Sequence, residues 1–187
     1  MTEKFVKVFF DTEFTSSGQN TDLVSIGLVS EKGETLYLEL NDYDPRMITP
    51  WVQSNVLPRL QGIGISKAQG KNRVEQWFKE IAGENRIQLV SPGKEIDSIL
   101  LYNLWGVTNG ENPLRSWQET MPRHISHRNH LDMDTLFVLC GIDPDKDRGT
   151  LVSLKEKENR HHALYDALLL KECWDTIVEP KLLSVIS

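Results

Sequence analysis

The sequence predicts an α/β fold, in which a mixed five-stranded sheet (an antiparallel meander, then parallel strands) carries helices on both faces. Three apolar runs of strand length lie near the N-terminus, and a short turn-like segment separates the second from the third. Further along the chain, strand-length apolar runs alternate with segments whose apolar residues recur at helical spacing. Strands joined by short turns pair antiparallel, and strands alternating with helices indicate a parallel part of the sheet.

The meander is predicted from three short runs. Residues 5–10 read FVKVFF, which is typical of a buried strand. Residues 23–29 and 35–40 are two further runs, joined around Glu31-Lys32-Gly33. A short turn with glycine between such runs indicates a hairpin.

The later elements complete the sheet and its helical layers. They are helices over residues 73–81, 94–105 and 160–178, and strands over residues 86–90 and within residues 130–138. The last helix is expected to end before Pro180, and the last strand is centred on LDMDTL. Residues 41–70 and 106–129 are irregular in pattern, and long loops often carry function or hold short helices.

The bulk composition indicates an ordinary globular chain. Its 187 residues suit one domain, spanning 1–187. No apolar run approaches the ~20 residues needed to cross a bilayer, and the first residues lack the features of a signal peptide. We therefore expect a cytoplasmic protein with no membrane partner. Cys140 and Cys173 have no CxxC partner, so we expect two buried thiols rather than a zinc site.

The formal net charge of −6 argues against a protein that grips long duplex DNA, because such proteins neutralise phosphates with Lys and Arg. A transcription factor or histone-like protein is disfavoured for this reason. A nucleic-acid enzyme is still compatible with the charge, because bound cations reverse the sign of the local field.

Two acids follow the first predicted strand directly. Asp11 and Glu13 lie two residues apart, and alternate side chains of an extended chain point to the same face. Two adjacent carboxylates repel each other unless a positive charge lies between them, and Mg²⁺ or Mn²⁺ with oxygen ligands meets that need. Taken alone, the pair is more simply explained as solvated acids at a strand end.

A second candidate acid is Asp97, which lies in SPGKEID, just inside the helix expected after the fourth strand. A carboxylate at that place also interacts favourably with the helix dipole, and Glu95 is a competing acid in the same turn. The third candidate is Asp166 in HHALYDA, well inside the last predicted helix. In a continuous helix His162, four residues earlier, would share its face, whereas His161 would reach it only from a loop or first turn.

The order and context of these acids resemble the DEDDh 3′→5′ exonucleases of the RNase H-like fold, over nearly the whole chain. FFDTEFT matches the Asp-x-Glu motif, LVSPGKEID the aspartate that opens a helix, and HHALYDA the His-x-Ala-x-x-Asp-Ala motif. Asp134-Thr135-Leu136 fits a strand that usually falls between the last two motifs. Chain length, DTEFT and residues 51–58 are most similar to the small bacterial and phage exoribonucleases that include ribonuclease AS. The departure is Ser91-Pro92-Gly93, where many relatives have His-Asn, which leaves substrate preference open.

The resemblance implies a two-metal hydrolysis. The metal ligands for two divalent cations, Mg²⁺ or Mn²⁺, would be Asp11, Glu13, Asp97 and Asp166. His161, rather than His162, would be the general base, because relatives have this histidine in a loop. The substrate would be single-stranded nucleic acid cut from the 3′ end to nucleoside 5′-monophosphates, with RNA preferred over DNA, and a homodimer is expected by analogy.

Substrate contacts are expected from the turn after the first motif. Relatives use this turn for the terminal nucleotide, which gives Thr12, Phe14 and Thr15 as the substrate-binding candidates. Phe14 could stack on a base or lie in the core. Trp51, Trp105 and Trp117 lie in or beside irregular segments, and one of them could line the substrate groove instead of the core.

Two other functions are compatible with the sequence. One is a 3′→5′ exodeoxyribonuclease acting on single-stranded DNA, because sugar choice depends on contacts to the 2′-OH that the sequence does not reveal. The other is a catalytically inactive RNase H-like nucleic-acid-binding or scaffold protein, since fold alone does not fix function. The intact set of four acids and a histidine favours catalysis. A calcium-binding protein is disfavoured because calcium loops space their acids more densely.

Overall fold

The computed structural model describes residues 4–18, 20–93, 95–106, 121–126, 129–152 and 159–186. Within these ranges the strands are β1 (Phe5–Phe14), β2 (Leu23–Ser30), β3 (Thr35–Glu39), β4 (Arg86–Ser91) and β5 (Leu131–Asp132). The α-helices are α1 (Pro50–Asn55), α2 (Lys67–Ala82), α3 (Glu95–Asn103), α5 (Met133–Leu139), α6 (Ala163–Cys173) and α7 (Glu179–Ile186). Short 3₁₀ turns cover Pro45–Met47, Leu57–Arg59 and Arg148–Thr150, and Trp174–Val178 forms a π-helix.

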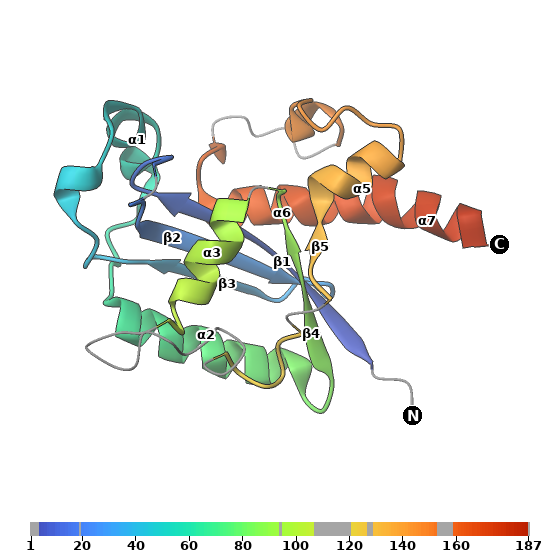
Figure 1. The fold of residues 1–187 in the computed structure, drawn as a ribbon, viewed down its shortest axis with the longest axis horizontal. Coiled ribbons are helices and arrows are strands. Elements are labelled where there is room, and N and C mark those ends of the chain that lie inside the picture. The colour runs from blue at the N-terminus through green and yellow to red at the C-terminus, as the bar shows by residue number, and fades with distance from the viewer. Residues whose placement is uncertain are drawn as a thin grey trace.

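The five strands form one mixed sheet in the order β3-β2-β1-β4-β5. Strands β1, β2 and β3 pair antiparallel, whereas β4 pairs parallel with β1 and β5 parallel with β4. Strand β1 therefore lies at the centre. The predicted fold class, a meander followed by parallel strands with helices on both faces, is confirmed (Figure 1).

Side chains of β1 alternate between the two faces of the sheet. Val8 and Phe10 are fully buried in a core that includes residues of α2 and α3. Phe9 is fully buried in a second core that includes residues of α5 and α6. Because direction alternates with a period of two, Asp11 shares the face of Phe9, toward α6, and Thr12 shares the face of Phe10, toward α3.

The predicted fifth strand is wrong beyond its first residues. Strand β5 has only two residues, and Asp134-Thr135-Leu136 lies in helix α5. The carboxylate of Asp132 accepts a hydrogen bond from the Thr135 backbone N–H at 2.7 Å and caps this helix. Met133, Leu136 and Phe137 are all buried, and they are three and four residues apart, which is helical spacing. In the sequence this spacing is hidden within a short apolar run that also fits a strand.

Helix bounds also differ from the predictions, for local reasons. Helix α2 begins six residues early because Ser66 and Gln69 form a capping box ahead of its polar first turn. Helix α6 begins at Ala163, which leaves His161 in a loop. The backbone stays helical past Pro180, in helix α7. The π-helical turn Trp174–Val178 lies directly before α7 and accommodates the backbone N–H that proline lacks.

The first irregular segment holds short helices. Helix α1 has Thr49 as its N-cap, whose side chain accepts a hydrogen bond from Val52 N at 3.2 Å. Strand β1 also extends farther than predicted, to Phe14, because pairing with β2 continues through Glu13 opposite Ser25. Trp117 lies outside the described residues. Among described residues no helix is long and apolar enough to cross a membrane.

Candidate active site

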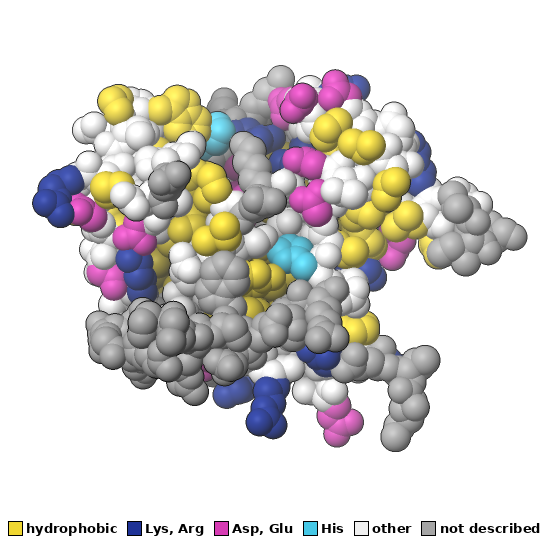
Figure 2. Space-filling model, viewed as in Figure 1, with side chains coloured by type: hydrophobic (Ala, Val, Ile, Leu, Met, Phe, Trp, Pro, Cys, Tyr) yellow, Lys and Arg dark blue, Asp and Glu magenta, His cyan; other side chains and the backbone are white. Residues whose placement is uncertain are grey.

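A cavity of about 700 Å³ opens where β1, α1, α3 and α6 meet. Its lining has a charged part and an apolar part. The acidic residues are Asp11, Glu13, Asp97 and Asp166, and the other charged or titratable residues are Arg148, Arg160 and His161. Phe14, Trp51, Val52 and Leu169 contribute apolar surface. On the face seen in Figure 2, hydrophobic side chains gather over α1 and α5, and acidic side chains lie beside the start of α5 and over the loop that follows it.

Asp97 reaches the cavity from the α3 side of the sheet. Its Oδ1 accepts hydrogen bonds from the Thr12 backbone N–H at 3.0 Å and from the Thr12 hydroxyl at 2.5 Å. Asp97 is only 3% exposed. Thr12 thus fixes this carboxylate to the central strand, next to Asp11 and Glu13.

Asp166 reaches the cavity because a glycine lets helix α6 approach the sheet. Gly27 in β2 lies directly opposite Asp11. A Cβ atom added at Gly27 would lie 2.3 Å from both the N and the Cα of Leu164. No side chain fits there, so the first turn of α6 rests on the backbone of β2 and brings Asp166 toward Asp11.

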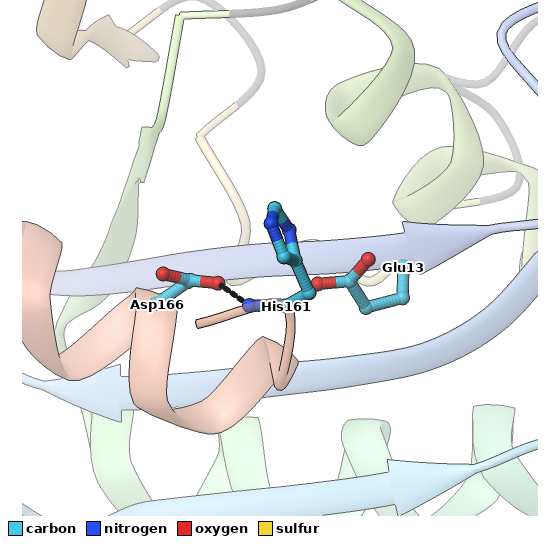
Figure 3. A group of neighbouring side chains, drawn as sticks. All are labelled: Glu13, His161 and Asp166. Carbon is cyan, nitrogen blue, oxygen red and sulfur yellow. Dashed lines mark hydrogen bonds between the residues drawn. The ribbon is translucent and has the colours of Figure 1, made fainter. Parts of the chain in front are cut away.

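His161 lies between two of the acids. Its backbone N–H donates to Asp166 Oδ2 at 2.8 Å, and Figure 3 shows the carboxylates of Glu13 and Asp166 on either side of it. One ligand atom from each of these three residues lies within 4.8 Å of the others. The imidazole meets Trp51 edge-on, with 4.8 Å between ring centroids.

His162 points elsewhere. Its ring stacks on Tyr37 with 4.3 Å between centroids and an interplanar angle of 25°. It is the N-cap residue of α6, and its side chain makes no capping hydrogen bond. The helical spacing that favoured His162 does not apply, because the helix begins after both histidines.

Burial raises the pKa values of three of these acids, and neighbouring acids add to the effect at Asp11 and Glu13. Burial, followed by the charges of Asp97, Asp166 and Glu13, raises the pKa of Asp11 well above its usual value. Burial, followed by Asp166 and Asp97, raises the pKa of Glu13 to about 8. Burial also raises the pKa of Asp166, although Arg160 opposes the effect. Such a group of carboxylates favours a bound cation.

The residues present fit divalent cations. Carboxylate oxygens are the ligands that Mg²⁺ and Mn²⁺ prefer. Asp166 Oδ1 is buried and has no hydrogen-bond partner among the described residues. Arg160 Nε lies 2.8 Å away from it, but its N–H is not directed for a hydrogen bond. A buried carboxylate oxygen without a hydrogen bond, in a cavity lined by three other acids, fits a metal ligand.

Two arginines at the site were not anticipated from the sequence. Arg160 also forms an ion pair with Asp147 at 3.0 Å. Arg148 pairs with Asp134 at 2.7 Å and donates a hydrogen bond to the carbonyl of Pro92, so it braces the loop before α3. Position next to HHALYDA is the one signal that could have identified Arg160. No sequence pattern marks Arg148.

The predicted substrate-binding residues separate into two groups. Thr12 and Phe14 line the cavity. Thr15 does not: it is fully buried, and its hydroxyl accepts a hydrogen bond from the Asp22 backbone N–H at 3.0 Å, so it holds the turn together. Trp51 lines the cavity and is 52% exposed, whereas Trp105 is buried and donates to Glu75.

Comparisons with known proteins agree with this geometry. The profile of the 3′-5′ exoribonuclease Rv2179c-like domain matches residues 6–178. The 3′-5′ exoribonucleases MT2234.1 and Rv2179c, from two strains of Mycobacterium tuberculosis, are each 32% identical over 122 residues, covering 63% of this chain and 68% of theirs. A crystal structure of a full-length 3′-exonuclease superposes with a TM-score of 0.51 at 12% identity, covering 96% of this chain and 81% of that one, which supports the fold alone.

The sheet order and the structural likeness define an α/β protein with the fold of the 3′-exonucleases. More particularly, the chain belongs to the Rv2179c-like 3′-5′ exoribonuclease family, because the family profile covers most of its length.

Proposed function

We propose that this protein is a metal-dependent 3′→5′ exoribonuclease that hydrolyses single-stranded RNA from its 3′ end and releases nucleoside 5′-monophosphates. The observation that carries the proposal is the convergence of Asp11, Glu13, Asp97 and Asp166 on one cavity. Burial and then the neighbouring acids raise the pKa values of Asp11 and Glu13, and burial raises that of Asp166. Family membership supplies the reaction class.

Asp11, Glu13, Asp97 and Asp166 would hold two divalent cations, Mg²⁺ or Mn²⁺. When bound, such ions supply the positive charge that offsets the reacting phosphate and acidify the attacking water. His161 would accept the proton of that water, because one of its ring nitrogens lies near the carboxylates of Glu13 and Asp166 and histidine is the commonest general base in enzymes. Thr12 would keep Asp97 oriented through its two hydrogen bonds.

The apolar part of the cavity would receive the terminal nucleobase. Phe14 and Trp51 both line it, and an aromatic ring stacks on any base. Arg160 and Arg148 lie at the same cavity and would attract the phosphates of the substrate. This arrangement would hold the terminal nucleotide by its base and its backbone.

One assay tests the proposal. The purified protein is incubated with 5′-labelled single-stranded RNA or DNA, with Mg²⁺, Mn²⁺ or EDTA. We expect a ladder that shortens from the 3′ end of RNA when metal is present, no products in EDTA, and slower cutting of DNA. Faster cutting of DNA would show an exodeoxyribonuclease. Binding of RNA without cutting would contradict the proposed enzymatic activity.

The assembly and the compartment belong to the same proposal. A homodimer follows from the resemblance, and sedimentation velocity measures it directly. Both cysteines, Cys140 and Cys173, are unpaired, which suits a reducing compartment such as the cytoplasm.

A further inference from the structure

Asp11 belongs to a row of three residues that crosses the sheet. In the strand pairing, Asp11 lies opposite Gly27, and Gly27 lies opposite Tyr37. Side chains directly opposite one another share a face. Gly27 leaves a gap in the middle of this row, and the backbone of Ala163 and Leu164 occupies it. The start of α6 is therefore flanked by a metal-binding candidate on one side and by Tyr37 on the other.

Tyr37 is itself held firmly. Its hydroxyl donates to Glu39 Oε1 at 2.9 Å, and Glu39 is only 2% exposed. Glu39 Oε2 also accepts the backbone N–H groups of Gly62 and Ile63, at 3.0 and 3.1 Å. The Tyr37 ring, on which His162 stacks, is thus tied to a buried carboxylate that organises the neighbouring loop.

The residue next to His162 has a strained backbone. His161 has a φ of 66°, the one positive φ among the described non-glycine residues. An L-residue other than glycine adopts this conformation at a cost in free energy, and it persists only where its surroundings hold it. This φ turns two adjacent histidines to different surroundings, His161 to the cavity and His162 to Tyr37.

We propose that Tyr37 is a positioning residue for His161. By stacking on His162, it holds the His161-His162 pair in the strained conformation that keeps the His161 imidazole between Glu13 and Asp166. The inference rests on the proposed function for the role of His161 as general base. Tyr37 itself does not line the cavity, so it acts on the reaction only through this pair.

The kinetic test uses variants on both sides of the stack. Tyr37→Leu and His162→Ala each remove the stack, and we expect kcat to fall about 10–100-fold, the scale of a small misplacement of a reacting group. KM and the Mn²⁺ affinity measured by calorimetry should change less than about twofold. Tyr37→Phe and His162→Phe keep an aromatic pair and should stay within about threefold of wild type. The double variant Tyr37→Leu/His162→Ala should be no worse than the worse single variant.

A matched control is available in another tyrosine–histidine pair. Tyr102 Oη lies 2.8 Å from His130 Nδ1, and neither residue lines the cavity. Tyr102→Leu should lower thermal stability without a selective fall in kcat. Wild-type kcat in folded Tyr37→Leu or His162→Ala would overturn the inference, as would equal kcat losses in Tyr102→Leu. If Tyr37→Leu does not fold, His162→Ala and its Phe counterpart decide the question.

A second readout does not depend on activity. The imidazole of His161 is edge-on to Trp51, so the ring current of the indole should displace its proton NMR signals. We expect Tyr37→Leu to shift these signals and Tyr37→Phe to leave them near their wild-type positions. Unchanged signals in folded Tyr37→Leu would overturn the positioning role. Full activity of His161→Ala would instead contradict the proposed general base, and the NMR result would still decide whether Tyr37 holds the loop.

Discussion

The two sides of the cavity are built in opposite ways. The acid side, formed by Asp11, Glu13, Asp97 and Asp166, comes from the central strand and from two helices that pack on opposite faces of the sheet. The apolar side, formed by Phe14, Trp51 and Val52, comes from the end of β1 and the short helix α1. On the acid side, burial and neighbouring acids disfavour the charged forms of Asp11 and Glu13, whereas the apolar side leaves Trp51 52% exposed.

This difference separates the two requirements of the proposed reaction. The acid side would act on the phosphodiester, so its changes should lower kcat. The apolar side would act on the base, so its changes should raise KM. An acid-side variant that mainly raises KM, or an apolar-side variant that mainly lowers kcat, would contradict this division.

The largest effect is expected from the acid side. Asp11→Asn keeps the size of the side chain and removes its charge, and kcat should fall about 10²–10³-fold or more, the scale of removing one preorganised electrostatic contact. In EDTA the same variant should unfold at a higher temperature than wild type, because a neutral amide avoids the burial cost and the repulsion that raise the pKa of Asp11. Asp145→Asn, at an exposed position, is the control for both measurements. Wild-type kcat in the Asp11→Asn variant would show that Asp11 is not part of the active site.

The next effect tests how α6 reaches the acid side. Gly27→Ala puts a Cβ against the backbone of Leu164, so α6 must shift and Asp166 with it. We expect a loss of about 1–3 kcal/mol in the free energy of unfolding, as for overpacked cores, and a fall in kcat larger than the rise in KM. Gly70→Ala in helix α2 is the control, because its nearest neighbour is the flexible end of Leu40 at 3.1 Å. Denaturant melts and steady-state kinetics of folded protein measure both effects.

Variants of the apolar side should have a smaller effect, on KM rather than on kcat. Trp51→Ala should raise KM about tenfold with kcat nearly unchanged, because stacking of one base on an aromatic ring contributes about 1–3 kcal/mol. Trp51→Phe should recover most of the affinity. Leu139→Ala changes a more exposed apolar residue, 74% exposed on α5, and should leave KM unaltered. Since Trp51 also contacts His161, a dominant fall in kcat would instead mean that it supports the histidine.

The smallest effect concerns stability against pH without metal. The pKa of Glu13 is about 8 in the folded protein and near 4.5 in the unfolded chain. Between these values the folded state keeps a proton that the unfolded chain has lost, so stability should fall as pH rises from about 5 to 8. We expect the melting temperature in EDTA to fall by several degrees over this range. Mn²⁺ or the Glu13→Gln variant should reduce the fall, and Glu80→Gln, at an exposed helix position, should not.

The acid side could be predicted largely from sequence because its signals are local. Asp11 and Glu13 share a face by strand alternation, and Asp166 lies in a recognisable helix start. Their convergence depends on Gly27, whose effect is visible only once α6 lies on β2. Spacing within an assumed helix favoured His162, whereas the family resemblance gave His161. The positive φ of His161 is the structural reason that the two adjacent rings have different surroundings.

The apolar side and the bracing residues were harder to predict. Trp51 is positioned by the Thr49 cap and a one-turn helix inside a stretch with no apolar period. Asp134 was assigned to a strand because its apolar neighbours fit either period, and the Asp132 cap makes it helical. Arg148 reaches the cavity through contacts with Pro92 and Asp134, far away in sequence, that no local pattern encodes.

The most direct test of the account is to grow crystals in Mn²⁺ and locate the ions from their anomalous scattering. The account predicts manganese bound by the carboxylates of Asp11, Glu13, Asp97 and Asp166, with Asp166 Oδ1 released from Arg160 and ligated. Crystals at saturating Mn²⁺ with no anomalous peak among these four side chains would contradict it.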